Sequence, residues 1–129
     1  QPLSFDAARR SVDQALEKAG ITRDEISFFE YHDAYSIYAA LSLEAAGFAE
    51  KGKGWELARD GAITPEGRIP CAIAGGLKAR GYPGGATGVY QAVEAATKLR
   101  DTSVSGEIAM IQSLGGPAST AVTHILTTA

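Results

Sequence analysis

The sequence predicts an α/β fold in which a mixed sheet is covered by helices. Helical and β-prone segments alternate along the chain with little spacer between them, in the order αβαβαββ. One β-prone segment leads into a glycine-dense loop and then into an apolar-periodic helix. The last two β-prone runs flank Gly115-Gly116-Pro117, which predicts a tight hairpin.

Length and composition bound the class of protein. A chain of 129 residues with a hydrophobic fraction of 45% predicts one globular domain. The net charge of -3 offers no electrostatic footprint for nucleic acid or anionic lipid, and no run of about eighteen apolar residues predicts a membrane span. Because Cys71 is alone, we expect no disulfide within the chain, no metal site and a reducing, cytoplasmic location.

The first half of the predicted domain begins with a helix over roughly 5–19. Ser4 is the expected N-cap, the apolar residues that follow recur at helical spacing, and Gly20 is the expected C-terminal stop. A polar turn then leads to a short aromatic strand over 26–31. This strand would deliver the polar segment 31–35 to its carboxyl end.

The middle of the chain is predicted to be less regular. A second helix is expected over 34–46 and ends at Gly47. The excursion that follows, 48–68, contains a helical turn at 55–59. The apolar run 69–73 then fits a short buried strand.

A glycine-dense loop from Gly75 to Gly88 is the most distinctive segment. Six of its fourteen residues are glycine, so its backbone can approach a ligand closely. Its bulky groups are Lys78, Arg80 and Tyr82. The two basic side chains are spaced to reach a phosphate or pantetheine group, although basic residues in such loops are more often simply solvated.

The loop opens a third helix, and a hairpin over 107–114 and 119–127 follows it. The glycines of the first helical turn suit either backbone amides that face a negative charge or tight packing of the helix on the sheet. The inner face of this helix is expected to consist of Val89, Ala92, Val93, Ala96 and Leu99.

Three polar or glycine-rich segments fall near the carboxyl ends of predicted strands. They are Tyr31–Tyr35, Gly75–Gly88 and Ser113–Gly116. Ligands of α/β sheets bind outside the carboxyl ends of the strands. We therefore expect these three segments to converge on one site.

The motifs resemble the thiolase superfamily, and most closely its branch of sterol-carrier-type thiolases, which includes non-specific lipid-transfer proteins and archaeal acetyl-CoA acetyltransferases. Four ordered blocks cover nearly the whole chain. They are 30–35, similar to E-x-H-D-C/A-F; 47–52, similar to G-F-x-x-K-G; 75–88, similar to GGxxxxGHPxGxxG; and 112–116, where thiolases have C-x-G or N-x-G-G.

The resemblance implies that residues 1–129 are a single thiolase-like C-terminal domain whose N-terminal half, the half with the acylated cysteine nucleophile, is missing. It implies a coenzyme A thioester as substrate and a place in lipid metabolism. The partners that it implies are an acyl-CoA, the N-terminal half, a second copy in a homodimer and a small zinc-containing OB-fold protein. Cys71 lies in an apolar run and is expected to be a buried hydrophobic residue.

The resemblance also implies roles for five catalytic candidates. His32 is expected to donate a hydrogen bond to an enolate oxygen, with Asp33 orienting it or the chain around it. Tyr82 stands where the family has its catalytic histidine, and a phenol with a reference pKa of about 10 is a poor base but a competent hydrogen-bond donor or acid. Tyr35 is a second tyrosine for proton transfer, and Ser113 takes the position of the second cysteine.

Seven further residues are expected to bind the acyl-CoA. They are Gly76, Lys78, Gly81, Gly84, Gly85, Gly115 and Gly116.

Three interpretations of this altered site stay open at the level of sequence. The loss of the cysteines and the gain of two tyrosines fit a retro-aldolase that cleaves a β-hydroxyacyl-CoA, which needs no acyl-cysteine. The same losses fit a catalytically silent subunit that binds acyl-CoA or lipid. In the third, an excised half binds another protein through the apolar surface that its partner half would cover. The His32-Asp33 pair has a plainer alternative too, in which it only satisfies backbone groups at the strand end.

Overall fold

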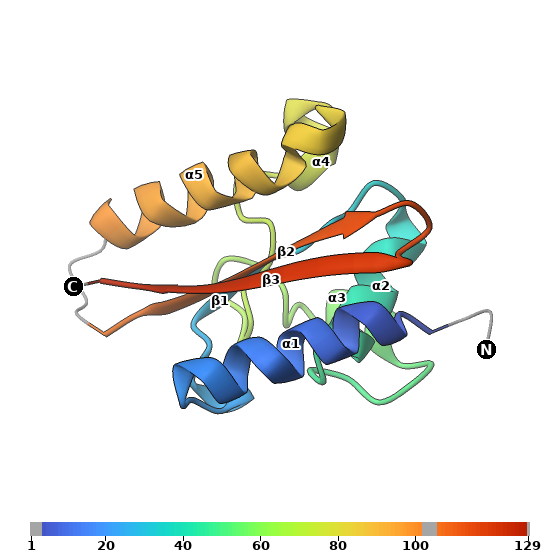
Figure 1. The fold of residues 1–129 in the computed structure, drawn as a ribbon, viewed down its shortest axis with the longest axis horizontal. Helices are drawn as coiled ribbons and strands as arrows, with labels where there is room; N and C mark the ends of the chain where they lie inside the picture. Colours follow the sequence, from blue (N-terminus) through green and yellow to red (C-terminus); the bar gives the residue numbers. More distant parts are fainter. Residues whose placement is uncertain (1–3, 102–105, 129) are drawn as a thin grey trace.

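The computed structural model describes residues 4–101 and 106–128 and contains a three-stranded sheet with helices on both faces (Figure 1). Helix α5 covers one face, while α1 and α2 lie on the other. The α/β class predicted from the sequence is therefore confirmed. In chain order the elements are α1 (Asp6–Ala19), the 3-10 helix η1 (Arg23–Glu25), β1 (Phe28–Glu30), α2 (Ser36–Ala45), α3 (Gly54–Arg59), α4 (Gly76–Arg80), the 3-10 helix η2 (Gly84–Ala86), α5 (Thr87–Asp101), β2 (Ile108–Gly115) and β3 (Thr120–Thr127).

The sheet is mixed, with the strand order β1-β2-β3. Strand β1 runs parallel to β2, with Glu30 opposite Ile111. Strands β2 and β3 pair antiparallel along their whole length and form the predicted hairpin. The parallel pair places the end of β1, where the polar segment 31–35 begins, at the same edge of the sheet as the β2–β3 turn.

The strand predicted over 69–73 is wrong in its extent, because the structure has only a single parallel bridge there, between Phe29 and Cys71. The Phe29 amide donates to the Pro70 carbonyl at 2.8 Å, and the Ala72 amide donates back to the Phe29 carbonyl at 3.1 Å. Ala72 has a φ of 45°, in the left-handed region. The chain therefore turns away after one bridge and enters the glycine loop.

Both predicted helix stops are confirmed. Gly20 and Gly47 have φ values of 67° and 82°, and each amide donates a hydrogen bond back into the last turn of its helix. The predicted N-cap is wrong, since Phe5 occupies the N-cap position of α1 without a side-chain hydrogen bond, and Ser4 lies one residue earlier. Glycine stops follow from backbone conformation alone, whereas a cap also depends on how the chain enters the helix.

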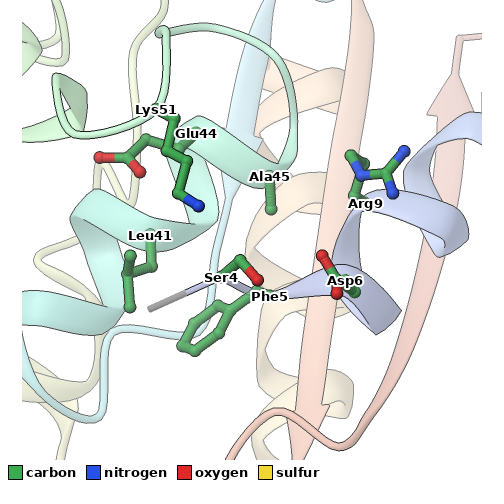
Figure 2. A pocket seen from close by; sticks show the side chains of 8 residues that line it. All are labelled: Ser4, Phe5, Asp6, Arg9, Leu41, Glu44, Ala45 and Lys51. Carbon is green, nitrogen blue, oxygen red and sulfur yellow. The ribbon is translucent and has the colours of Figure 1, made fainter. Parts of the chain in front are cut away.

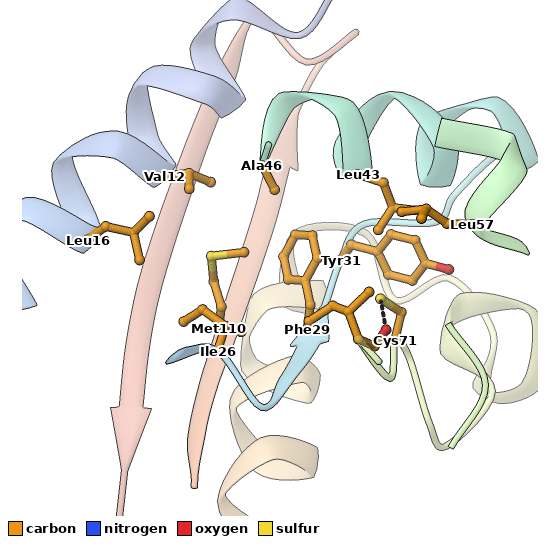
Figure 3. Close-up of a cluster of buried hydrophobic side chains, with 11 residues drawn as sticks. Val12, Leu16, Ile26, Phe29, Tyr31, Leu43, Ala46, Leu57, Cys71 and Met110 are labelled. Carbon is orange, nitrogen blue, oxygen red and sulfur yellow. Dashed lines mark hydrogen bonds between the residues drawn. The ribbon is translucent and has the colours of Figure 1, made fainter. Parts of the chain in front are cut away.

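The larger core cluster lies between the sheet and α1 and α2 (Figure 3). Phe29 and Tyr31 of the first strand and its extension pack there against Met110 of β2 and Leu43 of α2. Cys71 belongs to this cluster, and its thiol donates to the Ile69 carbonyl at 3.2 Å. Burial raises the pKa of the Cys71 thiol, which keeps it unreactive. The expectation of a buried hydrophobic cysteine is confirmed.

The opposite face of the sheet packs on α5, and the inner face that the sequence predicts is only partly correct, since Leu99 is buried and Ala92 packs against the same cluster as expected. Val89 and Val93 are 65% and 59% exposed, while Ala95 and Leu99 are buried. Gln91 is fully buried, and its side-chain amide donates to the Gln112 carbonyl at 2.8 Å. A hydrogen-bonded glutamine thus takes a core position, and two of the valines expected inside face outward.

Candidate functional site

The three segments that we expected to converge do meet around one cavity of about 680 Å³, called here the site cavity. It lies at the end of the sheet where β1 leads into α2, between the glycine loop and the β2–β3 turn. Residues from all three segments line it, together with parts of α2 and α3. The lining includes His32, Asp33, Tyr35, Lys78, Tyr82 and Gly116.

His32 is the most constrained polar group of the site cavity. Its side chain is buried, and its Nδ1 accepts a hydrogen bond from the Leu114 amide at 3.4 Å. With Nδ1 as acceptor, the neutral ring carries its proton on Nε2. Burial lowers the pKa of His32, Arg80 also lowers it, and Asp33 opposes this effect. The ring is therefore a neutral N–H donor of the kind that stabilises an enolate oxygen.

Two tyrosine rings stand at the mouth of the site cavity. Tyr35 and Tyr82 are each 65% exposed and both line it. The Tyr82 ring meets the His32 ring edge to face, with 5.9 Å between the centroids. Tyr35 packs in the same way on Tyr38, at 5.1 Å. Two phenols thus flank the buried imidazole.

Asp33 holds the glycine loop rather than the imidazole. Its Oδ1 accepts a hydrogen bond from the Leu77 amide at 3.0 Å, in the first turn of α4. Gly76 has a φ of 61°, and a Cβ added there would collide with the Asp33 carboxylate. Glycine is needed at this position for both reasons. Asp33 was expected to orient either His32 or the chain around it, and the structure shows it holding the chain.

The two basic residues of the loop have different surroundings. Lys78 is exposed and lines the site cavity. Arg80 instead forms an ion pair with Glu94 of α5, with 2.6 Å between Nη1 and Oε2 and side chains 12% and 21% exposed. Lys78 is therefore the basic loop side chain that faces the site cavity.

Ser113 lies outside the site cavity, in a groove of about 530 Å³ between α5 and the hairpin. We call this the α5 groove. Gly85 and Gly88 also line it, and a Cβ added at Gly88 would lie 3.2 Å from the Ser113 Cβ. The remaining glycines differ: Gly115 packs on Thr120, while Gly81 and Gly84 have positive φ values and open space around them.

Tyr38 lines the site cavity but was not predicted from the sequence, and Tyr31 was expected there only as the start of the segment 31–35. With them, four of the five tyrosines of the chain line the site cavity. Tyr38 lies three residues after Tyr35, the N-cap residue of α2, and the two rings are in contact, so the spacing of the two tyrosines is a signal that the sequence carries. Burial raises the pKa of Tyr31, which keeps this phenol protonated.

A second, smaller cavity of about 310 Å³ lies where the start of α1 meets α2 (Figure 2). Arg9, Glu44 and Lys51 stand around it, with Phe5 and Leu41 forming its apolar part. It shares no lining residue with the site cavity. We therefore treat it as a separate cavity that does not belong to the candidate site.

Neither membrane nor metal chemistry is apparent in the part of the chain that the structure describes. No helix there is long and apolar enough to cross a membrane. No group of three or more His, Cys, Asp or Glu side chains in the same residues is arranged to hold a metal ion.

Known proteins resemble the chain along nearly its whole length. The family model described as thiolase C-terminal domain-like matches residues 1–128. An acetyl-CoA acetyltransferase of Methanothermobacter thermautotrophicus is 41% identical over 126 residues, which are 94% of this chain and 33% of that protein. Sterol carrier protein 2 of Homo sapiens is 35% identical over 98 residues, 76% of this chain and 18% of the carrier protein.

A solved structure shares the fold. The Ltp2-ChsH2(DUF35) aldolase aligns with a TM-score of 0.76 and 22% identity, over 92% of this chain and 31% of the aldolase chain. The present chain thus spans about a third of the length of the acetyltransferase and of the aldolase.

Proposed function

This chain belongs to the thiolase C-terminal domain family, and from that premise we propose that it forms the acyl-CoA-binding half of an enzyme that makes or breaks a carbon–carbon bond next to a thioester. We propose in particular the retro-aldol cleavage of a β-hydroxyacyl-CoA. The observation that carries this proposal is the pairing of a neutral imidazole N–H donor, His32, with the phenol of Tyr82 in one cavity. A cavity equipped with donors and phenols suits enolate chemistry.

The proposed step needs three groups. One phenol oxygen takes the proton of the β-hydroxyl and passes its own proton to solvent as the bond between the α and β carbons breaks, which leaves an aldehyde or ketone. The electron pair of that bond moves into the thioester enolate, whose oxygen accepts from His32. The second phenol then protonates the α carbon and releases the shortened acyl-CoA. Solvent returns a proton to the second phenol at the end of the cycle. Tyr82 and Tyr35 are the two phenols at the mouth of the site cavity.

The coenzyme A part of the substrate would approach along the glycine loop. Lys78 is exposed at the rim of the site cavity and can pair with a phosphate. Gly116 lines the site cavity, and a residue without a side chain there lets a pantetheine chain lie close to the backbone. These contacts suit any acyl-CoA, so the acyl group itself would be selected elsewhere in the protein.

A complete enzyme requires more than this chain, since the acetyltransferase that it matches is about three times longer. We propose that residues 1–129 are one C-terminal domain and that an N-terminal half covers the exposed valines of α5 and the α5 groove, so that Ser113 lies between the halves. A small OB-fold partner is proposed as well, because the solved aldolase pairs Ltp2 with ChsH2(DUF35). A homodimer and a cytoplasmic location stay predictions.

The decisive assay uses the full-length protein with a β-hydroxyacyl-CoA and a β-ketoacyl-CoA, and measures the release of acetyl-CoA. We expect cleavage of the hydroxyacyl substrate, and a loss of about a hundredfold to ten-thousandfold in kcat for Tyr82→Phe. Tyr90→Phe is the matched control, because Tyr90 is the one tyrosine outside the site cavity. Cleavage of the ketoacyl substrate alone would show that the reaction is thiolysis and not retro-aldol cleavage. Cleavage of neither substrate would favour a catalytically silent subunit that binds acyl-CoA.

A further inference from the structure

Glu30, Arg80 and Glu94 form a charged cluster, buried at Glu30 and partly buried at the other two, that no step of the proposed function uses. Glu30 is 3% exposed at the end of β1, two residues before His32. Arg80 ends α4, two residues before Tyr82, and pairs with Glu94 of α5 at 2.6 Å. The cluster therefore joins the strand that carries the imidazole, the loop that carries the phenol and the helix that covers both.

The hydrogen bonds of Glu30 are incomplete if its carboxyl group is ionised. Oε1 accepts from the Ile73 amide at 3.3 Å, just before the glycine loop, whereas Oε2 is buried and has no partner among the described residues. Glu94 lines the same cavity of about 400 Å³ as Glu30, and its carboxyl group contributes to the raised pKa of Glu30. A buried carboxylate oxygen without a partner is costly, and two carboxylates in contact repel. A proton on Glu30, donated to Glu94, removes both costs.

The charge of the cluster leads to the same conclusion. Two carboxyl groups face one guanidinium, so the cluster is neutral only when one carboxyl is protonated. At the rim of the adjoining cavity of about 400 Å³, Lys98 and Asp101 carry opposite charges and offset each other. The other titratable groups around Glu30 are Tyr31, His32 and Cys71.

The acidity of Glu30 agrees with this arrangement. Burial above all, and then the negative charge of Glu94, raises the pKa of Glu30 to about 7, against the opposing effects of the Ile73 amide and Arg80. Glu30 therefore keeps its proton to a higher pH than an exposed glutamate does.

We propose that Glu30 is a protonated positioning residue, whose carboxyl group donates to Glu94 so that Glu94, in its ion pair with Arg80, keeps the Tyr82 loop against His32. The positioning role rests on the proposed function, whereas the proton and the ordering of the loop do not. When Glu30 loses its proton at higher pH, the cluster gains a buried negative charge. The link between β1, the loop and α5 then loosens.

Glutamine is the informative substitution at position 30. Its amide N–H₂ donates to Glu94 and its oxygen accepts from Ile73, so Glu30→Gln copies the protonated state and cannot ionise. Glu30→Ala removes both bonds. Glu17→Gln is the matched control, because Glu17 is exposed on α1, on the other face of the sheet.

The first test is the melting temperature of the full-length protein between about pH 5.5 and 9. We expect Glu30→Gln to gain stability relative to the wild type as the pH rises toward 7 and to keep that gain above it, whereas Glu17→Gln follows the wild type. A Glu30→Gln variant that is less stable than the wild type at about pH 8 would overturn the protonated state. This measurement needs no activity, so it holds whether or not the proposed reaction occurs.

The second test follows the loop and the reaction. At about pH 8, amide hydrogen exchange over 76–88 should be slower in Glu30→Gln than in the wild type, and fastest in Glu30→Ala. The kcat for the β-hydroxyacyl-CoA should fall above about pH 7 in the wild type and less steeply in Glu30→Gln, with KM little changed. Equal loop exchange in all three proteins would overturn the positioning role, even if no substrate is cleaved.

Discussion

The imidazole of His32 and the phenol ring of Tyr82 meet edge to face, with centroids 5.9 Å apart and ring planes inclined at 82°. His32 is buried and tied to the Leu114 amide, while Tyr82 is 65% exposed on a glycine loop. A fixed hydrogen-bond donor thus touches a more accessible phenol. This division of properties suits a site where one group stabilises charge and the other moves a proton.

Replacing the imidazole should affect the chemical step more than binding. In the full-length protein, His32→Gln is expected to lower kcat for β-hydroxyacyl-CoA cleavage by about a hundredfold to a thousandfold with little change in KM, because the donor to the developing oxyanion is displaced. Steady-state kinetics measure both constants, and circular dichroism checks that the variant is folded. A rise in KM at constant kcat would instead assign His32 to substrate binding.

The buried imidazole also predicts a pH effect on stability. Because burial lowers the pKa of His32 below its usual value of 6.5, the unfolded chain takes up a proton that the folded chain resists. His32 should therefore lower the free energy of unfolding as the pH drops below about 6.5, against the opposite contribution that the raised pKa of Glu30 makes in the same range, and His32→Gln should lack this loss. Chemical denaturation of both proteins between about pH 7 and 5 measures the difference. Parallel curves would contradict it.

Elements with local determinants were predictable from the sequence. The glycine stops at Gly20 and Gly47 depend on a backbone conformation that glycine adopts at little cost, and the hairpin depends on turn residues between two β-prone runs. The convergence of the site segments also followed, because a parallel pair brings the end of β1 beside the end of β2. The family resemblance, drawn from four motif blocks, is confirmed.

The sequence predictions that were wrong or incomplete concern residues whose positions depend on tertiary contacts. The predicted inner face of α5 is correct at Leu99 but wrong at Val89 and Val93, because the hydrogen-bonded Gln91 and the small Ala95 face the sheet in their place. Ser113 separates from the site cavity because alternate residues of β2 face opposite sides of the sheet, which places its side chain toward α5, whereas Gly116 follows the strand. The Glu30 cluster joins three elements far apart in sequence and has no local signal.

The approach of Gly76 to Asp33 predicts an unusually costly glycine substitution. Gly76→Ala must adopt a positive φ, at about 1–2 kcal/mol, and also displace the Asp33 carboxylate that caps α4. Gly20→Ala is the matched control, since its φ is also positive but nothing lies within 4 Å of the added carbon.

The measurement is the free energy of unfolding of the full-length protein by denaturant. We expect Gly76→Ala to lose more than Gly20→Ala, and to lose activity as well because the loop that carries Tyr82 shifts. In a protein that already carries Asp33→Ala, which removes the carboxylate, Gly76→Ala should cost less free energy of unfolding. Equal losses of unfolding free energy in Gly76→Ala and Gly20→Ala would show that the loop accommodates the added methyl group without strain.

The outward valines of α5 predict where the rest of the protein packs. Val89 is 65% exposed here, and it would be buried if an N-terminal half covers the α5 groove. Val89→Asp should therefore destabilise the full-length protein by several kcal/mol, because the substitution buries an unpaired charge, yet leave chain 1–129 nearly unchanged if that chain is prepared alone.

Gln14→Asp places the same charge on the exposed face of α1 and should change neither protein much. Melting temperatures of the four variants measure the contrast. A Val89→Asp effect as small in the full-length protein as in chain 1–129 would place the N-terminal half on another surface.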